Sequence, residues 1–136
     1  SYGRSWSCPP AVGSVERAKE RASAYSRGII VQTMGPLADS FDMDGTAALM
    51  QRHRKNFDTL VRQMRQLYPD CLPMGAGTCR ICRSCTYPDR PCRHPDRMVA
   101  SMEAYGLLVS DVATKSGLKY NYGDNTMCFT SCVLID

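Results

Sequence analysis

Four closely spaced cysteines restrict what this chain can fold into more than any other feature. Cys79, Cys82, Cys85 and Cys92 follow the pattern C-x2-C-x2-C-x6-C. Thiols at this spacing bind one metal centre more readily than they form disulfides, because three cysteines so close together cannot all pair with one another. They lie in residues 69–95, a stretch rich in proline and glycine without helical or strand periodicity. The sequence therefore predicts a long metal-binding loop.

The spacing favours a [4Fe-4S] cluster over a zinc ion. A cubane cluster offers separate iron corners to separate thiolates, and cysteines two residues apart can wrap one face of it. Zinc sites usually take one C-x2-C pair from each of two separate segments, so a third cysteine two residues further on crowds a tetrahedral ion. Zn2+, and free thiols or disulfides, remain open as alternatives. His94, two residues after Cys92, is an alternative ligand or a hydrogen-bond donor to the cluster.

The other four of the eight cysteines lack this spacing. Cys8 stands in an irregular Cys-Pro-Pro segment and is a candidate ligand for a second metal, whose further ligands would precede this sequence. Cys71 is more simply a free thiol. Cys128 and Cys132 are four residues apart on a predicted strand and share one face. Free cysteines commonly pack as small hydrophobic side chains, which is the expectation for these last two.

The hydrophobic pattern predicts an α+β domain with a small, mostly antiparallel sheet. Apolar runs between turn residues predict strands at about 28–34, 118–122 and 127–135. The last two strands are expected to form a hairpin. Helical spacing predicts helices at about 15–25, 46–68, 96–105 and 109–116. On the long helix His53 lies on the apolar stripe, which predicts a buried, hydrogen-bonded histidine and not a ligand.

Length and charge limit the class of protein. A chain of 136 residues suits a single domain, so residues 1–136 are expected to form one metal-binding domain. The sequence does not begin with Met, and its N-terminus is expected to be truncated. The apolar runs are too short to span a membrane, which takes about 20 residues. A net charge of +4 is too small to suggest a nucleic-acid binder.

Three segments resemble a known family of predicted metal-binding proteins, catalogued as domain of unknown function 2284. They are YGRSWSCPPA (2–11), LPMGAGTCRICRSCTYPDRPCRHPDR (72–97) and SMEAYGLLVSDVATKSGLKYNYGDNT (101–126). The resemblance implies metal binding at the four spaced cysteines and an origin largely among anaerobic bacteria and archaea. It implies no particular reaction. Family members usually have further cysteines ahead of the Cys-Pro-Pro segment, so a second site at Cys8 would be incomplete in this chain.

The predicted function is electron transfer through one [4Fe-4S] cluster, either to a partner protein or as an accessory redox subunit. The cysteine loop is basic and suits an acidic partner. One alternative is an enzyme or cofactor-handling protein with a pocket beside the cluster, lined by tyrosines: Tyr87, Tyr105, Tyr120 and Tyr122. Another is a zinc-stapled interaction module. No catalytic residue stands out, and a non-catalytic role is favoured.

The expected location is the cytoplasm. An oxygen-sensitive cluster and several unpaired thiols both suit a reducing compartment. The sequence does not indicate an oligomeric state.

Overall fold

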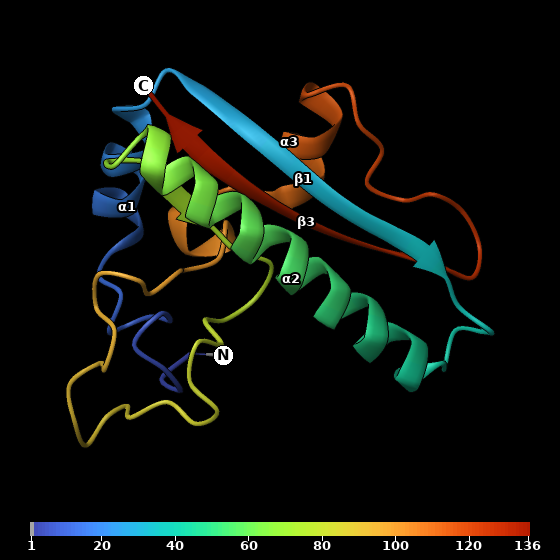
Figure 1. The fold of residues 1–136 in the computed structure, drawn as a ribbon, viewed down its shortest axis with the longest axis horizontal. Helices are drawn as coiled ribbons and strands as arrows, with labels where there is room; N and C mark the ends of the chain where they lie inside the picture. Colours follow the sequence, from blue (N-terminus) through green and yellow to red (C-terminus); the bar gives the residue numbers. More distant parts are fainter. Residues whose placement is uncertain (1) are drawn as a thin grey trace.

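The computed structural model describes residues 2–136 and shows three α-helices, a short 3-10 helix and three strands (Figure 1). In chain order these are α1 (Val15–Ser23), β1 (Arg27–Pro36), α2 (Met43–Leu67), β2 (Leu72–Met74), η1 (Glu103–Tyr105), α3 (Val109–Lys115) and β3 (Thr126–Ile135). The α+β class expected from the sequence is confirmed. No helix within residues 2–136 is long and apolar enough to cross a membrane.

The C-terminal strand β3 lies in the middle of a three-stranded antiparallel sheet with the order β1-β3-β2. It pairs with β1 along ten residues, from Arg27 opposite Ile135 to Pro36 opposite Thr126. Its other edge pairs with the three residues of β2, which places Met74 opposite Cys132. The expected strands at 28–34 and 127–135 are therefore present; β1 is longer at both ends, and β3 begins one residue earlier.

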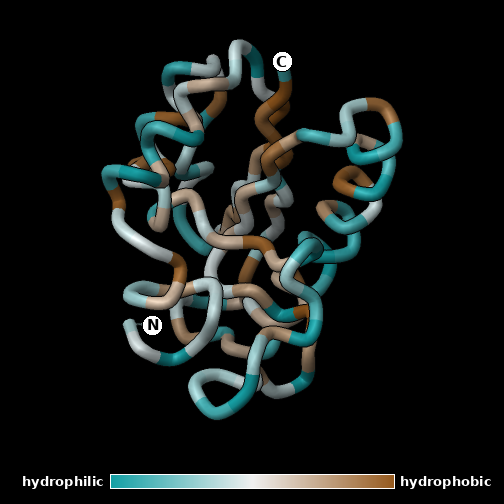
Figure 2. Tube along the Cα trace, turned by 90° about the vertical axis from the view of Figure 1, so that its left-hand side faces the viewer, coloured by the Kyte–Doolittle hydropathy of each residue, from teal (hydrophilic) through white to brown (hydrophobic). Residues whose placement is uncertain are grey.

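Side chains alternate along β3 between two hydrophobic cores. Val133 and Ile135 pack with the buried face of α2, including Phe57 and Val61. Cys132 faces the opposite side, where the core contains β2, η1 and the apolar faces of α1 and α3. The sheet is thus covered on both faces (Figure 1). Figure 2 shows strongly hydrophobic residues along the strand that leads to the C-terminus.

Helix α2 begins earlier than the sequence pattern predicts, because Asp42 caps it. One carboxylate oxygen of Asp42 accepts a hydrogen bond from the Gly45 amide at 2.8 Å, and the other accepts from the Ala38 amide at 2.9 Å. These bonds favour the ionised carboxyl and lower the pKa of Asp42. The cap joins the preceding loop to the first turn of the helix.

The helix expected at 96–105 is wrong. Only residues 103–105 are helical, as η1. The backbone just before η1 pairs with the end of β2: the Gly75 amide donates to the Ala100 carbonyl at 2.8 Å, and Met102 donates back to Gly75 at 3.4 Å. Since these groups are used across the chain, they are not available for a helix. Of the apolar residues that suggested a helix, Met102 and Tyr105 enter the core beside β2, whereas Val99 packs against the core under α2 and Met98 lines the cysteine cavity.

The strand expected at 118–122 is also absent from the described residues, and the hairpin with 127–135 is wrong. Strand β1 occupies one edge of β3 along its whole length. The 118–122 segment is held through side chains: Gln32 donates to the Lys119 carbonyl at 2.8 Å and accepts from the Tyr122 hydroxyl at 2.6 Å. The loop therefore lies against β1 without joining the sheet.

The region expected to be an uninterrupted loop, 69–95, begins with the short strand β2. Pro73 lies at the centre of this strand, which is compatible with an edge position because proline has no amide to donate to a ladder. Beyond β2 the chain is irregular as far as η1, in agreement with a cysteine-rich loop. Figure 1 shows this loop, in yellow and orange, beside the blue N-terminal segment.

His53 is the buried, hydrogen-bonded core histidine that the sequence predicts. Only 1% of its surface is exposed. Its Nδ1 lies 2.9 Å from the Thr33 hydroxyl, and its Nε2 lies 2.7 Å from the Ser131 hydroxyl. Its ring stacks on Phe57 at 6.3 Å between centroids. The histidine ties α2 to both β1 and β3, and burial lowers its pKa.

We expect the free energy of unfolding to fall on acidification because of His53. The lowered pKa means that the unfolded chain binds this proton more readily than the folded one. The resulting stabilisation is complete above about pH 6.5 and is lost as the pH falls through the folded value. Denaturant titrations should give a lower free energy of unfolding at about pH 5.5 than at about pH 7.5. The variant His53→Gln should largely remove this difference between the two pH values.

Met74→Ala is the control for this prediction, because Met74 is fully buried in the opposite core. It should lower the free energy of unfolding by about 2–5 kcal/mol at both pH values and leave their difference unchanged. The interpretation fails if the His53→Gln protein retains the full wild-type difference.

Candidate metal centre

The four spaced cysteines line a single small cavity of about 30 Å³. Cys79, Cys82, Cys85 and Cys92 all contribute to its wall, together with His94 and the apolar side chains of Trp6, Ile81 and Met98. Sequence spacing alone could suggest that the four thiols belong together, but Trp6 and Met98 come from outside the cysteine run. The fold therefore brings three separate segments to one sulfur-rich site.

The thiols are accessible from solvent. Cys85 is exposed and the other three are half-buried, and all eight cysteines of the chain are free thiols. Among residues 2–136, no three His, Cys, Asp or Glu side chains are gathered tightly enough to hold one metal ion. The cavity has room for about two water molecules. Loading a larger group therefore requires the cysteine side chains or the exposed loop to move outward.

The N-terminal segment is clamped onto the cysteine loop. The Trp6 indole N–H donates to the Arg90 carbonyl at 3.0 Å, and its ring meets the Tyr87 ring edge-on, with 5.1 Å between centroids. The Cys79 amide donates to the Ser7 hydroxyl at 3.0 Å. These contacts fix both ends of the cysteine run, although 70 or more residues separate the partners in sequence.

Further hydrogen bonds hold the loop to α2 and to itself. The Arg54 guanidinium, on α2, donates to the Arg80 carbonyl at 2.9 Å. Within the loop, Arg93 donates to the Ser84 carbonyl at 2.8 Å. Arg54 and Arg93 therefore each hold a backbone carbonyl of the loop. The five arginines of the loop are nevertheless exposed and leave a basic surface around the thiols: Arg80, Arg83, Arg90, Arg93 and Arg97.

Cys8 is buried next to this site but is not part of its wall. Its exposed fraction is 5%. The Ser5 hydroxyl donates to its sulfur at 3.1 Å, and the Ser7 hydroxyl lies 4.0 Å away. Cys8 lines a neighbouring cavity, whose wall also includes Gly77 and Glu103. A metal-ligand role for Cys8 stays a prediction, and its position makes Ser7 the link between Cys8 and the cysteine loop.

The remaining cysteines lie away from this cavity. Cys71 and Cys132 are buried in the cores, and burial raises the pKa of both thiols, that of Cys132 to about 12. Protonated thiols are poor metal ligands, because the thiolate is the coordinating form. Cys128 is half-buried on β3, with its sulfur 3.8 Å from the Thr130 hydroxyl.

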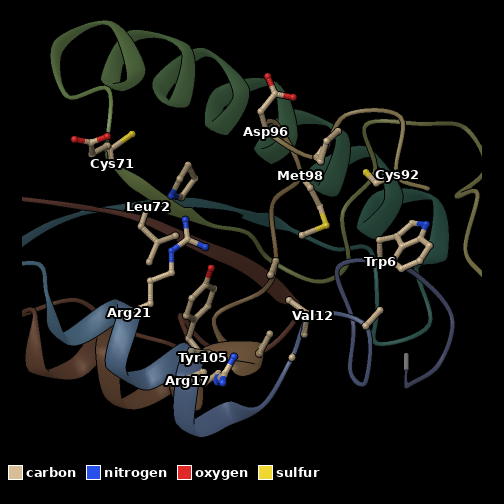
Figure 3. A pocket seen from close by; sticks show the side chains of 18 of the residues that line it. Trp6, Val12, Arg17, Arg21, Cys71, Leu72, Cys92, Asp96, Met98 and Tyr105 are labelled. Carbon is tan, nitrogen blue, oxygen red and sulfur yellow. The ribbon is translucent and has the colours of Figure 1, made fainter.

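A much larger pocket, of about 760 Å³, adjoins the cysteine cavity (Figure 3). Trp6, Cys92 and Met98 belong to the walls of both. One alternative expected from the sequence is a pocket beside the cluster, lined by four tyrosines, but three of those tyrosines do not line this pocket. Of those four only Tyr105 lines it, together with Tyr25.

The three misplaced tyrosines have other positions in the fold. Tyr87 packs on Trp6, Tyr122 bonds to Gln32, and Tyr120 is 49% exposed. The pocket could not be predicted in detail, since α1, the end of α2 and η1 contribute much of its wall.

The fold and the cavity together define a small α+β domain that presents a cysteine-rich loop around a thiol-lined cavity. The chain belongs to the family of predicted metal-binding proteins known as domain of unknown function 2284, whose family model matches residues 1–135. No curated protein and no solved structure is significantly similar to it. Membership confirms the resemblance carried by the three segments and supports a metal cofactor without specifying which one.

The residues around the cavity fit a thiolate-bound metal. Thiolates select soft or borderline metals such as zinc and iron–sulfur clusters, and four of them complete a common donor set. The apolar side chains of Trp6, Ile81 and Met98 keep the surroundings of the sulfurs low in polarity. Such surroundings control solvent access to a metal centre and tune its chemistry.

We expect Trp6→Ala to loosen the cysteine loop. The change removes an edge-to-face ring contact and an indole hydrogen bond to the loop backbone. Together these are worth about 1–3 kcal/mol, so amide hydrogen exchange in residues 79–92 should accelerate. Tyr2→Ala is the control, since Tyr2 is in the same segment and 76% exposed. Unchanged exchange in the Trp6 variant would show that the clamp does not order the loop.

Proposed function

We propose that this protein is an iron–sulfur protein that binds one [4Fe-4S] cluster through Cys79, Cys82, Cys85 and Cys92 and transfers electrons to a partner protein. The observation that supports it most is the shared cavity lined by all four thiols. Bound there, the cluster supplies a one-electron redox centre. Zn2+ in the same cysteines is the competing cofactor.

The chain's own residues would hold and tune such a centre. The four thiolates are its ligands, and Ser7 and Trp6 hold the backbone that carries them. Exposed guanidinium groups around the loop stabilise added negative charge, so they favour the reduced state and raise its potential. Because the centre lies at the surface, with Cys85 exposed, a partner can approach it closely.

The same arginines define the partner's chemistry. Between residues 79 and 97 the chain has five arginines and two aspartates. A basic surface of this kind accelerates encounters with an acidic protein and makes the rate depend on salt. An acidic redox protein is therefore the proposed partner.

The ligand assignment predicts that Cys82→Ser loses most of its iron. The wild-type protein, purified without oxygen, should contain about four iron and four sulfide per chain and give an electron paramagnetic resonance signal after one-electron reduction. The variant should lose both, because serine replaces a thiolate ligand. Cys128→Ser is the matched control, since Cys128 lies on β3 outside the cavity. Full iron and sulfide in Cys82→Ser would remove Cys82 from the ligand set.

A second candidate function is an enzyme or cofactor-handling protein in which the cluster stands beside a bound small molecule. The 760 Å³ pocket favours it, because an electron carrier needs no such space and because Cys92 belongs to both walls. Two observations distinguish the two candidates. A ligand that changes the paramagnetic signal of the reduced cluster supports the second, whereas salt-dependent electron exchange with an acidic protein supports the first.

A further inference from the structure

We propose that the 760 Å³ pocket binds a small organic oxyanion, a carboxylate or a phosphate, with three arginines as the anion-binding groups. Arg17, Arg21 and Arg65 all line this pocket. Its volume lies within the range of about 300–1,000 Å³ that is typical of small-molecule sites. The proposed anion site depends only on the residues that line the pocket. Its position beside a redox centre depends in addition on the proposed function.

The three guanidinium groups reach the pocket from two helices. Arg17 and Arg21 are four residues apart on α1, so their side chains share one face of that helix. Arg65 stands in the last turn of α2. Guanidinium groups present several N–H donors in a planar array that suits carboxylate and phosphate oxygens, often in pairs. All three arginines belong to the wall of one pocket, and several guanidinium groups around one space suit an oxyanion.

Tyr105 adds a neutral donor. Its ring is buried, with 6% of the residue exposed, and Figure 3 shows its hydroxyl directed into the pocket near Arg21. Burial raises the pKa of Tyr105, partly offset by the Arg21 charge, so the hydroxyl keeps its proton and can donate. Tyr25 also lines the pocket, but its hydroxyl donates to the Asp70 backbone carbonyl.

Two carboxylates limit the charge that the pocket can accept. Asp70 and Asp96 belong to the wall, so the pocket has three cationic and two anionic groups. This balance suits a ligand with one or two negative charges better than a polyanion. Val12, Leu72 and Met98 supply apolar wall for the rest of the molecule.

The pocket also sets where the ligand lies relative to the metal centre. Figure 3 shows Trp6 and Cys92 at the end of the pocket opposite Cys71, with Arg21 and Tyr105 between them. Because Cys92 belongs to the cysteine cavity as well, a ligand held by the arginines extends toward a metal ligand. Trp6 also lines the pocket and is the one tryptophan of the chain, so its fluorescence can report binding.

The test measures binding of phenyl phosphate and benzoate by calorimetry and Trp6 fluorescence, in wild type and variants. Benzyl alcohol, which has the same ring without a charge, should not bind comparably. Arg21→Gln should weaken binding of the favoured anion about five- to tenfold, because one charge-assisted contact is lost. Arg62→Gln is the matched control: it removes the same charge from α2, but Arg62 is exposed and outside the pocket.

Tyr105→Phe keeps the buried ring and removes only the hydroxyl, so a smaller loss of affinity is expected there. The proposal is overturned if neither anion binds saturably, if benzyl alcohol binds as well as they do, or if Arg21→Gln and Arg62→Gln weaken binding equally. Stronger binding of phenyl phosphate assigns a phosphate ligand, and stronger binding of benzoate assigns a carboxylate. Iron analysis of the same samples keeps the two proposals separate, since anion binding without iron would contradict only the iron–sulfur proposal.

Discussion

Strand β3 is the element on which the rest of the structure depends, because both other strands bond to it and both cores contain its side chains. Val133 faces α2, and Cys132 faces the opposite core. The pairing of Leu72–Met74 with the end of β3 fixes where the chain leaves the sheet and enters the cysteine loop. His53, bonded to Ser131, ties the long helix to the same strand. The cysteine loop therefore begins at a backbone position that its pairing with β3 holds in place.

The loop has little core of its own and depends on contacts from distant segments. Trp6 and Ser7 attach it to the N-terminal segment, and Arg54 attaches it to α2. These contacts order the backbone while leaving the thiols near solvent. The N-terminal segment also forms part of the larger pocket, since Trp6 belongs to both walls. Changes in this short segment should affect metal binding and ligand binding together.

The sequence was informative where the signal is local. The four cysteines lie within one loop, so their spacing can be read directly from the sequence. The apolar periodicities of β1, α2 and β3 also involve residues that are close together in the chain. The sequence failed where distant backbone decides the outcome. The residues before η1 have a helical pattern, but Gly75 forms hydrogen bonds with the Ala100 carbonyl and the Met102 amide. The wall of the large pocket could not be predicted for the same reason, since the fold and not any motif brings Arg21 and Arg65 to it.

Metal analysis can decide whether the four cysteines hold one iron–sulfur centre, as we propose. The intact protein, purified without oxygen, would be analysed for iron, zinc and acid-labile sulfide, with its absorption spectrum recorded before and after reduction. A [4Fe-4S] cluster in these cysteines would give iron and sulfide in equal amounts, about four of each per chain, and visible absorption that decreases on reduction. Stoichiometric zinc with no iron or sulfide, in a colourless protein, would contradict it.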